Sequence, residues 1–173
     1  MAAAEAAANA NNADLSARTR AAIARGARVI VWSETSGLVL KRGEGVLLRD
    51  LSTIAHEASV YIFAAYGALN EKSPLPLENR FAAISPTGGT AWIFDKAHPI
   101  YGAESENVRA GKKVLPIIDT LFGRIGIVIC HDADFADVVG QTRARGVDLL
   151  IVPSSDWPEI LELHADMTRY RAV

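Results

Sequence analysis

Short runs of β-branched and aromatic residues alternate along the chain with longer stretches in which apolar residues recur at helical spacing. The alternation of strand and helix signals is typical of an α/β protein. The short runs predict strands, and they cover residues 28–32, 60–65, 80–85, 90–94, 123–130 and 147–152. The helical spacing predicts helices over residues 14–25, 46–59 and 135–145.

Turn residues separate several of these elements. The sequence Pro-Thr-Gly-Gly between residues 80–85 and 90–94 predicts a β-hairpin. Residues 71–78 contain Pro74 and Pro76 and predict a loop. The sequence therefore predicts a sheet protein whose strands are joined by helices, one hairpin and one longer loop.

Three of the predicted strands end in side chains that can carry out chemistry. Glu34, Lys96 and Cys130 each lie at the end of a different apolar run. Catalytic groups in α/β proteins collect at strand ends. Taken singly, a charged residue there can be the solvated start of a loop, and a free cysteine can be a small buried apolar residue. Their occurrence together favours a catalytic site.

Cys130 is the single cysteine of the chain, and it lies directly before the acidic sequence that opens the predicted helix at residues 135–145. This pattern predicts a strand-to-helix turn. Such a turn points the side chain at the positive end of a helix dipole, which favours the thiolate over the thiol. The sequence therefore predicts a nucleophile at Cys130.

Four segments around these residues resemble motifs of the nitrilase, or carbon-nitrogen hydrolase, superfamily. They are residues 32–34 (Trp-Pro-Glu, with Ser33 for the proline), 94–98 (Tyr-x-Lys-x-His), 126–132 (Gly-x-x-Ile-Cys-Tyr-Asp/Glu, with His131 for the aromatic residue) and 146–154 (Gly-Ala-Asp-Leu-Leu-x-x-Pro-Ser). The resemblance covers residues 18–173 and implies a Glu-Lys-Cys triad made of Glu34, Lys96 and Cys130.

The resemblance also implies a reaction. The Cys130 thiolate attacks an amide, nitrile or ester carbon and forms a thioester, and Glu34 serves as the general base. Lys96 and the backbone N–H of His131 stabilise the oxyanion. We therefore expect a hydrolase of non-peptide carbon-nitrogen bonds that takes a small-molecule amide or acyl substrate and needs no cofactor.

Two segments resemble the apolipoprotein N-acyltransferases and their relatives. Residues 155–173 resemble the segment typical of that branch, and residues 96–104 have its Lys-x-His-x-x-x-x-x-Glu spacing. Acyl transfer to nitrogen is therefore the alternative reaction, although Pro-Ile-Tyr-Gly replaces the apolar Leu-Val-Pro-Phe of the branch. In this interpretation Glu104 is the second, substrate-positioning glutamate, with Glu106 as the alternative.

Other side chains complete the predicted site. We expect His131, Asp132 and Trp157 to contact substrate, and Asn79 and Arg80 to shape the site.

Competing constellations are weaker. A Cys-His dyad would need His131, which points away across the turn, or His98, which could approach only through the fold. A metal site at His131, Asp132 and Asp134 is conceivable, but carboxylates at a helix N-terminus more often act as caps. We therefore expect no metal. No glycine-rich phosphate loop follows a strand.

Composition bounds the function further. The chain has 173 residues, half of them hydrophobic, and a net charge of −2, which is typical of a globular protein with one core. The absence of basic clusters argues against a nucleic-acid partner. A lone cysteine suits a reducing compartment, and no apolar run reaches the roughly 18 residues of a spanning helix. We expect a cytoplasmic protein.

Residues 1–13 are rich in alanine and asparagine, and we expect a disordered lead-in there. Residues 14–173 are expected to form a partial carbon-nitrogen hydrolase domain. The resemblance implies an α/β fold, a four-layer αββα sandwich, of which the first strand and the C-terminal part are expected to be missing. The completed protein is expected to be a homo-oligomer, bound to membranes only if helices precede it. An inactive or partner-completed fragment is the other alternative.

Overall fold

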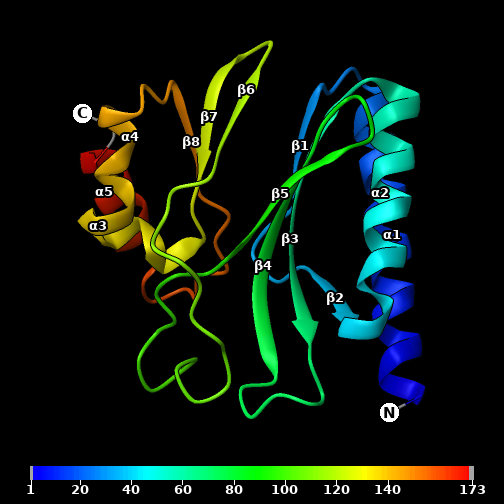
Figure 1. Cartoon of the computed structure of the whole chain (residues 1–173), viewed down its shortest axis with the longest axis horizontal. Coiled ribbons are helices and arrows are strands. Elements are labelled where there is room, and N and C mark those ends of the chain that lie inside the picture. The colour runs from blue at the N-terminus through cyan, green and yellow to red at the C-terminus, as the bar shows by residue number, and fades with distance from the viewer. Residues whose placement is uncertain (1, 172–173) are drawn as a thin grey trace.

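Two β-sheets pack face to face between two layers of helices in the computed structural model, which describes residues 2–171 (Figure 1). Helices α1 (Ala2–Ala24) and α2 (Glu44–Ala58) cover one outer face. Helices α3 (Ala136–Val139), α4 (Gln141–Ala144) and α5 (Leu161–Arg171) cover the other. The predicted αββα sandwich is confirmed.

The larger sheet has the strand order β1-β3-β4-β5, and β2 pairs with the far end of β3. Its strands are β1 (Val29–Val31), β2 (Gly37–Leu40), β3 (Tyr61–Leu69), β4 (Leu77–Ile84) and β5 (Thr90–Asp95). Strands β1 and β2 run parallel to β3, whereas β4 and β5 form the antiparallel hairpin that the sequence predicts.

The smaller sheet has the order β6-β7-β8. Strand β6 (Ile117–Thr120) pairs antiparallel with β7 (Gly123–Ile127), which pairs parallel with β8 (Leu149–Ile151). Backbone pairing continues beyond the ends of these strands, because Val128 N–H donates to Ile151 and Cys130 N–H donates to Pro153. The extended chain therefore continues to Ile129, and Cys130 follows directly, at the start of the turn.

Strand β3 is buried on both faces. Successive side chains of a strand point to opposite sides, and a hydrophobic core lies on each side of β3. Phe63 and Ala65 belong to the core between the two sheets, with Ile125 and Ile127 of β7. The intervening residues belong to a second core under α2, which includes Ile62, Ala64, Tyr66 and Ala68. The continuous apolar run of this strand follows from its place between two cores.

Helix α1 begins at Ala2, so the expected disorder at residues 1–13 is wrong for residues 2–13; Met1 lies outside the described residues. Alanine has the highest helix propensity, which favours this helix. Its Asn12 side chain also binds the edge of β2, with Nδ2 2.6 Å from Leu38 O and Oδ1 3.1 Å from Leu38 N. Asn11 Nδ2 donates to Ser36 O at 2.7 Å. These side chains anchor the polar half of the helix.

The single helix predicted at residues 135–145 is wrong, because two short helices, α3 and α4, meet there at Gly140. Gly140 N–H still donates to Ala136 O at 2.9 Å, and α4 begins at the next residue. Helix α5 and strands β2 and β6 lie in segments for which no element was predicted. Within residues 2–171 we find no helix that is long and apolar enough to cross a membrane.

Candidate active site

Glu34, Lys96 and Cys130 converge on one pocket of about 180 Å³, although each follows a different strand. Glu34 follows β1, Lys96 follows β5, and Cys130 begins the short 3-10 helix η2 (Cys130–Asp134) after β7. The pocket is lined by these three residues and by Thr35, Ile100, Ala103, Glu104, Ser155, Asp156 and Trp157. The packing of the two sheets therefore brings the three predicted residues together.

Lys96 lies between two carboxylates and is fully buried. Its Nζ is 2.8 Å from Glu34 Oε1 and 2.7 Å from Glu104 Oε2. Burial acts to lower the pKa of Lys96, but the charge of Glu34 and the hydrogen bonds to Glu104 and Glu34 outweigh it and raise the pKa. Lys96 is therefore a fixed positive charge at the base of the pocket.

Glu34 is held by three donors from three parts of the chain. Besides Lys96, Asn79 Nδ2 donates to Oε1 at 2.9 Å and the Ser155 N–H donates to Oε2 at 3.0 Å. Ser33, which replaces the proline of the family motif, donates its hydroxyl to Ser154 O at 2.5 Å. These bonds join the end of β1 to the segment after β8 and fix the position of the Glu34 carboxylate.

Cys130 adopts a backbone φ of 46°, in the left-handed region that side chains other than glycine rarely occupy. Burial and the neighbouring Glu34 charge raise the pKa of the Cys130 thiol to about 12, although Lys96 opposes them. The direction of this pKa shift is opposite to the predicted preference for the thiolate. The helix that follows Cys130 is one short 3-10 segment, too short to offset burial.

The predicted substrate-contacting residues divide into two groups. Glu104 and Trp157 line the pocket, and Trp157 is 46% exposed. Glu104 also accepts hydrogen bonds from the Ile100 N–H at 2.9 Å and from Asn79 Nδ2 at 3.4 Å. Glu106, the alternative, is exposed and lies outside the pocket lining. Of the two glutamates, only Glu104 contacts Lys96 in the described structure.

Asp132 does not line the pocket, contrary to its predicted contact with substrate, and it is fully buried behind the turn. Its carboxylate accepts hydrogen bonds from the backbone N–H groups of His98 at 2.7 Å, Ala97 at 3.2 Å and Ile129 at 3.3 Å. Burial raises its pKa, against these hydrogen bonds. Asp132 therefore ties the loop that follows Lys96 to the turn that carries Cys130.

The two histidines considered for a Cys-His dyad lie beside this clamp and outside the pocket lining. The ring of His98 stacks on Phe135 at 3.9 Å and places Nδ1 3.1 Å from Asp132 Oδ1. His131 Nδ1 lies 3.2 Å from His98 O, and its ring meets Phe135 edge-on. The side chain of His131 is therefore part of the support of the turn, and only its backbone remains a candidate for contact with substrate.

Asn79 and Arg80, both expected to shape the site, point to opposite faces of β4. Asn79 contacts the site through Glu34, whereas Arg80 pairs with Glu44, Glu78 and Asp95. The expectation is wrong for Arg80, because neighbouring side chains of a strand alternate between its two faces.

Asp156 and His164, which lie beside Cys130, were not among the predicted site residues. Asp156 Oδ1 lies 3.7 Å from Cys130 Sγ and 2.8 Å from His164 Nδ1. Donor atoms of Cys130, Asp156 and His164 all lie within 4.8 Å of one another, the one such group in the described part of the chain that could hold a metal ion. No spacing signal identified them, because Asp156 reaches the turn from the segment after β8 and His164 reaches it from α5.

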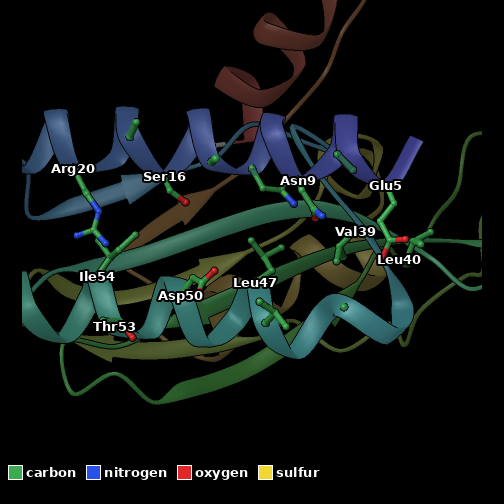
Figure 2. Close-up of a pocket in the computed structure, with 16 residues that line it drawn as sticks. Glu5, Asn9, Ser16, Arg20, Val39, Leu40, Leu47, Asp50, Thr53 and Ile54 are labelled. Carbon is green, nitrogen blue, oxygen red and sulfur yellow. The ribbon is translucent and has the colours of Figure 1, made fainter. Parts of the chain in front are cut away.

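A second, larger hollow of about 680 Å³ lies between α1 and α2 (Figure 2). Figure 2 shows Ser16 and Arg20 of α1 facing Leu47 and Asp50 of α2 across it. It shares no lining residue with the pocket at Cys130, and no histidine or cysteine lines it. The candidate chemistry therefore belongs to the smaller pocket.

Comparison with known proteins identifies the family of the chain. The family model described as carbon-nitrogen hydrolase matches residues 2–172. A probable nitrilase of Schizosaccharomyces pombe is 28% identical over 130 residues, which are 71% of this chain and 47% of that protein. The omega-amidase of Bos taurus is 31% identical over 115 residues, which are 62% of this chain and 41% of that protein.

Solved structures share the fold. An amidase from Nesterenkonia sp. AN1, determined as a mutant in complex with acrylamide, matches with a TM-score of 0.81 and 16% identity over 96% of this chain and 66% of that one. A carbon-nitrogen hydrolase from Helicobacter pylori G27 matches with a TM-score of 0.82 and 16% identity over 96% of this chain and 65% of that one. The chain spans about half the length, or less, of the curated relatives it matches.

Proposed function

This chain belongs to the carbon-nitrogen hydrolase family, and on that premise we propose that it hydrolyses small amides through a thioester formed on Cys130. The observation that carries this proposal is the convergence of Glu34, Lys96 and Cys130 on one small pocket. The same pocket also holds Glu104 against Lys96.

The first step moves the thiol proton. Because the pKa of Cys130 is raised to about 12, the thiol needs a base when it attacks. Glu34 is that base: its carboxylate takes the proton while sulfur forms a bond to the amide carbon. The raised pKa keeps the cysteine protonated until a substrate is in place, which limits its side reactions.

The second step expels the amine. The carbonyl electrons that moved onto oxygen return, the C–N bond breaks, and Glu34 gives its proton to the leaving ammonia or amine. Water then attacks the thioester, Glu34 accepts a proton from that water, and the thiol leaves with it. Atoms and protons balance, and the products are a carboxylic acid and ammonia or an amine.

Lys96 stabilises the negative charge that develops during both attacks. Its ammonium group is fixed by Glu34 and Glu104 and is fully buried, so it needs little reorganisation as the charge appears. The backbone N–H of His131, next to Cys130 in the turn, is the second donor to the oxyanion in this proposal. The role of Asp132 is to position this turn, since its carboxylate binds Ile129 and the loop after Lys96.

The pocket favours a small amide without a carboxylate. Three acidic side chains, Glu34, Glu104 and Asp156, line it, and its one cation, Lys96, is already paired with two of them. A substrate carboxylate would find no free cation among these residues. Ile100, Ala103 and Trp157 offer apolar contacts for a short acyl chain.

Acyl transfer to an amine is the second candidate reaction, because the same thioester serves both. The side chains of Trp157 and Ile100 line the pocket and offer apolar contacts to an acyl chain. The named relatives, a probable nitrilase and an omega-amidase, favour hydrolysis.

The test is to trap the acyl-enzyme. We expect a short primary amide to add its acyl mass to Cys130, together with release of ammonia. Cys130→Ser and Cys130→Ala should both lose the adduct and the ammonia release. An adduct that persists in Cys130→Ala, or hydrolysis without Cys130, would contradict the proposal. An added amine that takes up the acyl group faster than water does would instead select the transferase reaction.

A further inference from the structure

Cys130 lies beside two side chains, Asp156 and His164, of the types that bind metal ions, and the proposed hydrolysis does not use them. Asp156 Oδ1 is 3.7 Å from Cys130 Sγ, on the side of the pocket formed by the segment after β8. His164, from the first turn of α5, places Nδ1 2.8 Å from the same carboxylate oxygen. One donor atom from each of the three residues lies within 4.8 Å of the others.

His164 is buried, with 7% of its surface exposed, and its other ring nitrogen has no hydrogen-bond partner. Asp134 lies on the side of that nitrogen, with Nε2 and Oδ2 4.0 Å apart. Leaving a buried ring nitrogen without a hydrogen bond costs free energy. The nitrogen on the side of Asp156 is Nδ1, so Nδ1 is the atom that a metal ion beside Cys130 would use, while Nε2 stays on the side of Asp134.

We propose that Cys130, Asp156 and His164 bind a zinc-type divalent cation that closes the site. Zinc prefers thiolate, imidazole and carboxylate ligands in a tetrahedron, with bonds of about 2.0–2.3 Å. Such bonds place ligand atoms roughly 3.5 Å apart. Asp156 Oδ1 and His164 Nδ1, now 2.8 Å apart, must therefore separate slightly as their hydrogen bond opens, and the other donor atoms, all within 4.8 Å, must stay or move closer. Three protein ligands leave a fourth position for water.

Binding exchanges one proton for one metal ion, with no change of oxidation state. The Cys130 S–H bond breaks, its proton leaves to the buffer, and the sulfur donates its electron pair to the metal, as Asp156 and neutral His164 also do. Glu34 lies close enough to Cys130 to favour the cation, and Lys96 opposes it. Lys96 is already paired with Glu34 and Glu104, which limits that opposition.

The consequence for activity depends on the proposed function. If Cys130 is the nucleophile, a bound cation blocks its lone pair and inhibits turnover until a chelator removes it. Binding itself can be measured without turnover, so failure of this inference and failure of the proposed hydrolysis are distinguishable.

Cobalt(II) and zinc are the probes. We expect cobalt to give a thiolate-to-cobalt charge-transfer band with the wild-type chain, and zinc to abolish it by displacement. Zinc should also protect Cys130 from iodoacetamide, and a chelator should restore alkylation. This measurement needs no variant. Absence of the band, or alkylation that zinc does not slow, would overturn the proposal.

Variants assign the ligands. Cys130→Ser should lose the band, and both His164→Gln and Asp156→Asn should weaken zinc binding by at least about tenfold, since even outer partners of metal ligands contribute that much. His56→Gln, an exposed histidine of α2, is the matched control and should leave the affinity unchanged. Circular dichroism of each variant identifies one that fails to fold, and the wild-type protection assay then decides. Unchanged zinc affinity in a folded His164→Gln variant would overturn the assignment.

Discussion

Lys96 Nζ lies 2.8 Å from Glu34 Oε1, although the two residues are 62 positions apart and follow different strands of the larger sheet. Both side chains are buried, and burying two charges is costly unless they are paired and hydrogen-bonded. Here the Glu104 carboxylate also pairs with Lys96, and the Asn79 amide and the Ser155 N–H donate hydrogen bonds to Glu34. Such an arrangement is typical of a functional site.

Replacing Lys96 by methionine keeps the length of the side chain and removes its charge. We expect kcat to fall by about 10²–10³-fold, with a smaller change in KM, because a charge that stabilises the oxyanion is lost. Lys96→Arg is the matched control for charge, and we expect it to recover folding but little activity, since the larger, planar guanidinium does not reproduce the compact point charge that Lys96 places between Glu34 and Glu104. Steady-state kinetics, with circular dichroism to verify folding, measures both variants. A loss confined to KM would assign Lys96 to substrate binding alone.

Replacing Glu34 by glutamine should affect turnover and thiol reactivity in opposite directions. Turnover should fall because the base is lost. The Glu34 charge raises the pKa of Cys130, so its removal should lower that pKa and increase the thiolate fraction at a given pH. Alkylation by iodoacetamide between pH 7 and 9, followed by mass spectrometry, should therefore be faster in Glu34→Gln than in wild type. Slower alkylation would mean that Glu34 deprotonates Cys130 even without substrate.

The charge of the pocket predicts its substrate range. Between two amides of equal length, we expect the neutral one to have a kcat/KM at least about tenfold above that of one ending in a carboxylate, since about 1.4 kcal/mol of repulsion corresponds to that ratio. Asp156→Asn should narrow the difference, because it removes one of the three acids of the pocket. Ammonia release from paired substrates measures both effects. A preference for the carboxylate substrate would indicate a cation that lies outside this set of residues.

Sequence patterns predicted the parts of the fold that depend on local periodicity. Strand β3 and helix α2 have strong apolar patterns and lie close to their predicted positions. Motif resemblance predicted the sandwich and selected Glu34, Lys96 and Cys130, which line one pocket. Strand β2 was not predicted, because four residues carry little periodicity and its pairing with β3 is non-local.

The long-range contacts around Cys130 were beyond the reach of the sequence. Asp156 approaches Cys130 from the segment after β8 and His164 from α5, and no local pattern encodes either approach. The thiol pKa was wrongly predicted for a related reason. The helix dipole was inferred from local sequence, whereas the burial and the Glu34 charge that dominate the pKa depend on tertiary packing. Asn12 likewise orders a segment of low complexity through one distant contact with Leu38.

Arg80 provides the last prediction, which concerns stability and lies apart from the pocket. Its guanidinium, 11% exposed, contacts Glu44 at 2.6 Å, Glu78 at 2.8 Å and Asp95 at 2.8 Å. Burial acts to raise the pKa of Glu44 and of Glu78, but hydrogen bonds and charges from Lys41 and Arg80 outweigh it, so both values lie below 4.5. Carboxylates with lowered pKa values stabilise the folded state above their unfolded pKa, and this stabilisation is lost as the pH falls through the folded values.

Arg80→Met should therefore lower the free energy of unfolding by about 3–5 kcal/mol near pH 7. The difference in this free energy from wild type should shrink below about pH 4.5 as the glutamates become protonated. Arg42→Met, which removes an exposed arginine paired with Glu5 and Glu71, is the matched control and should cost less than about 1 kcal/mol. Urea unfolding of wild type and the two variants between pH 3 and 8 measures these differences. If Arg80→Met lowers the free energy of unfolding equally at every pH, packing of the arginine stem, and not its charge, stabilises the fold.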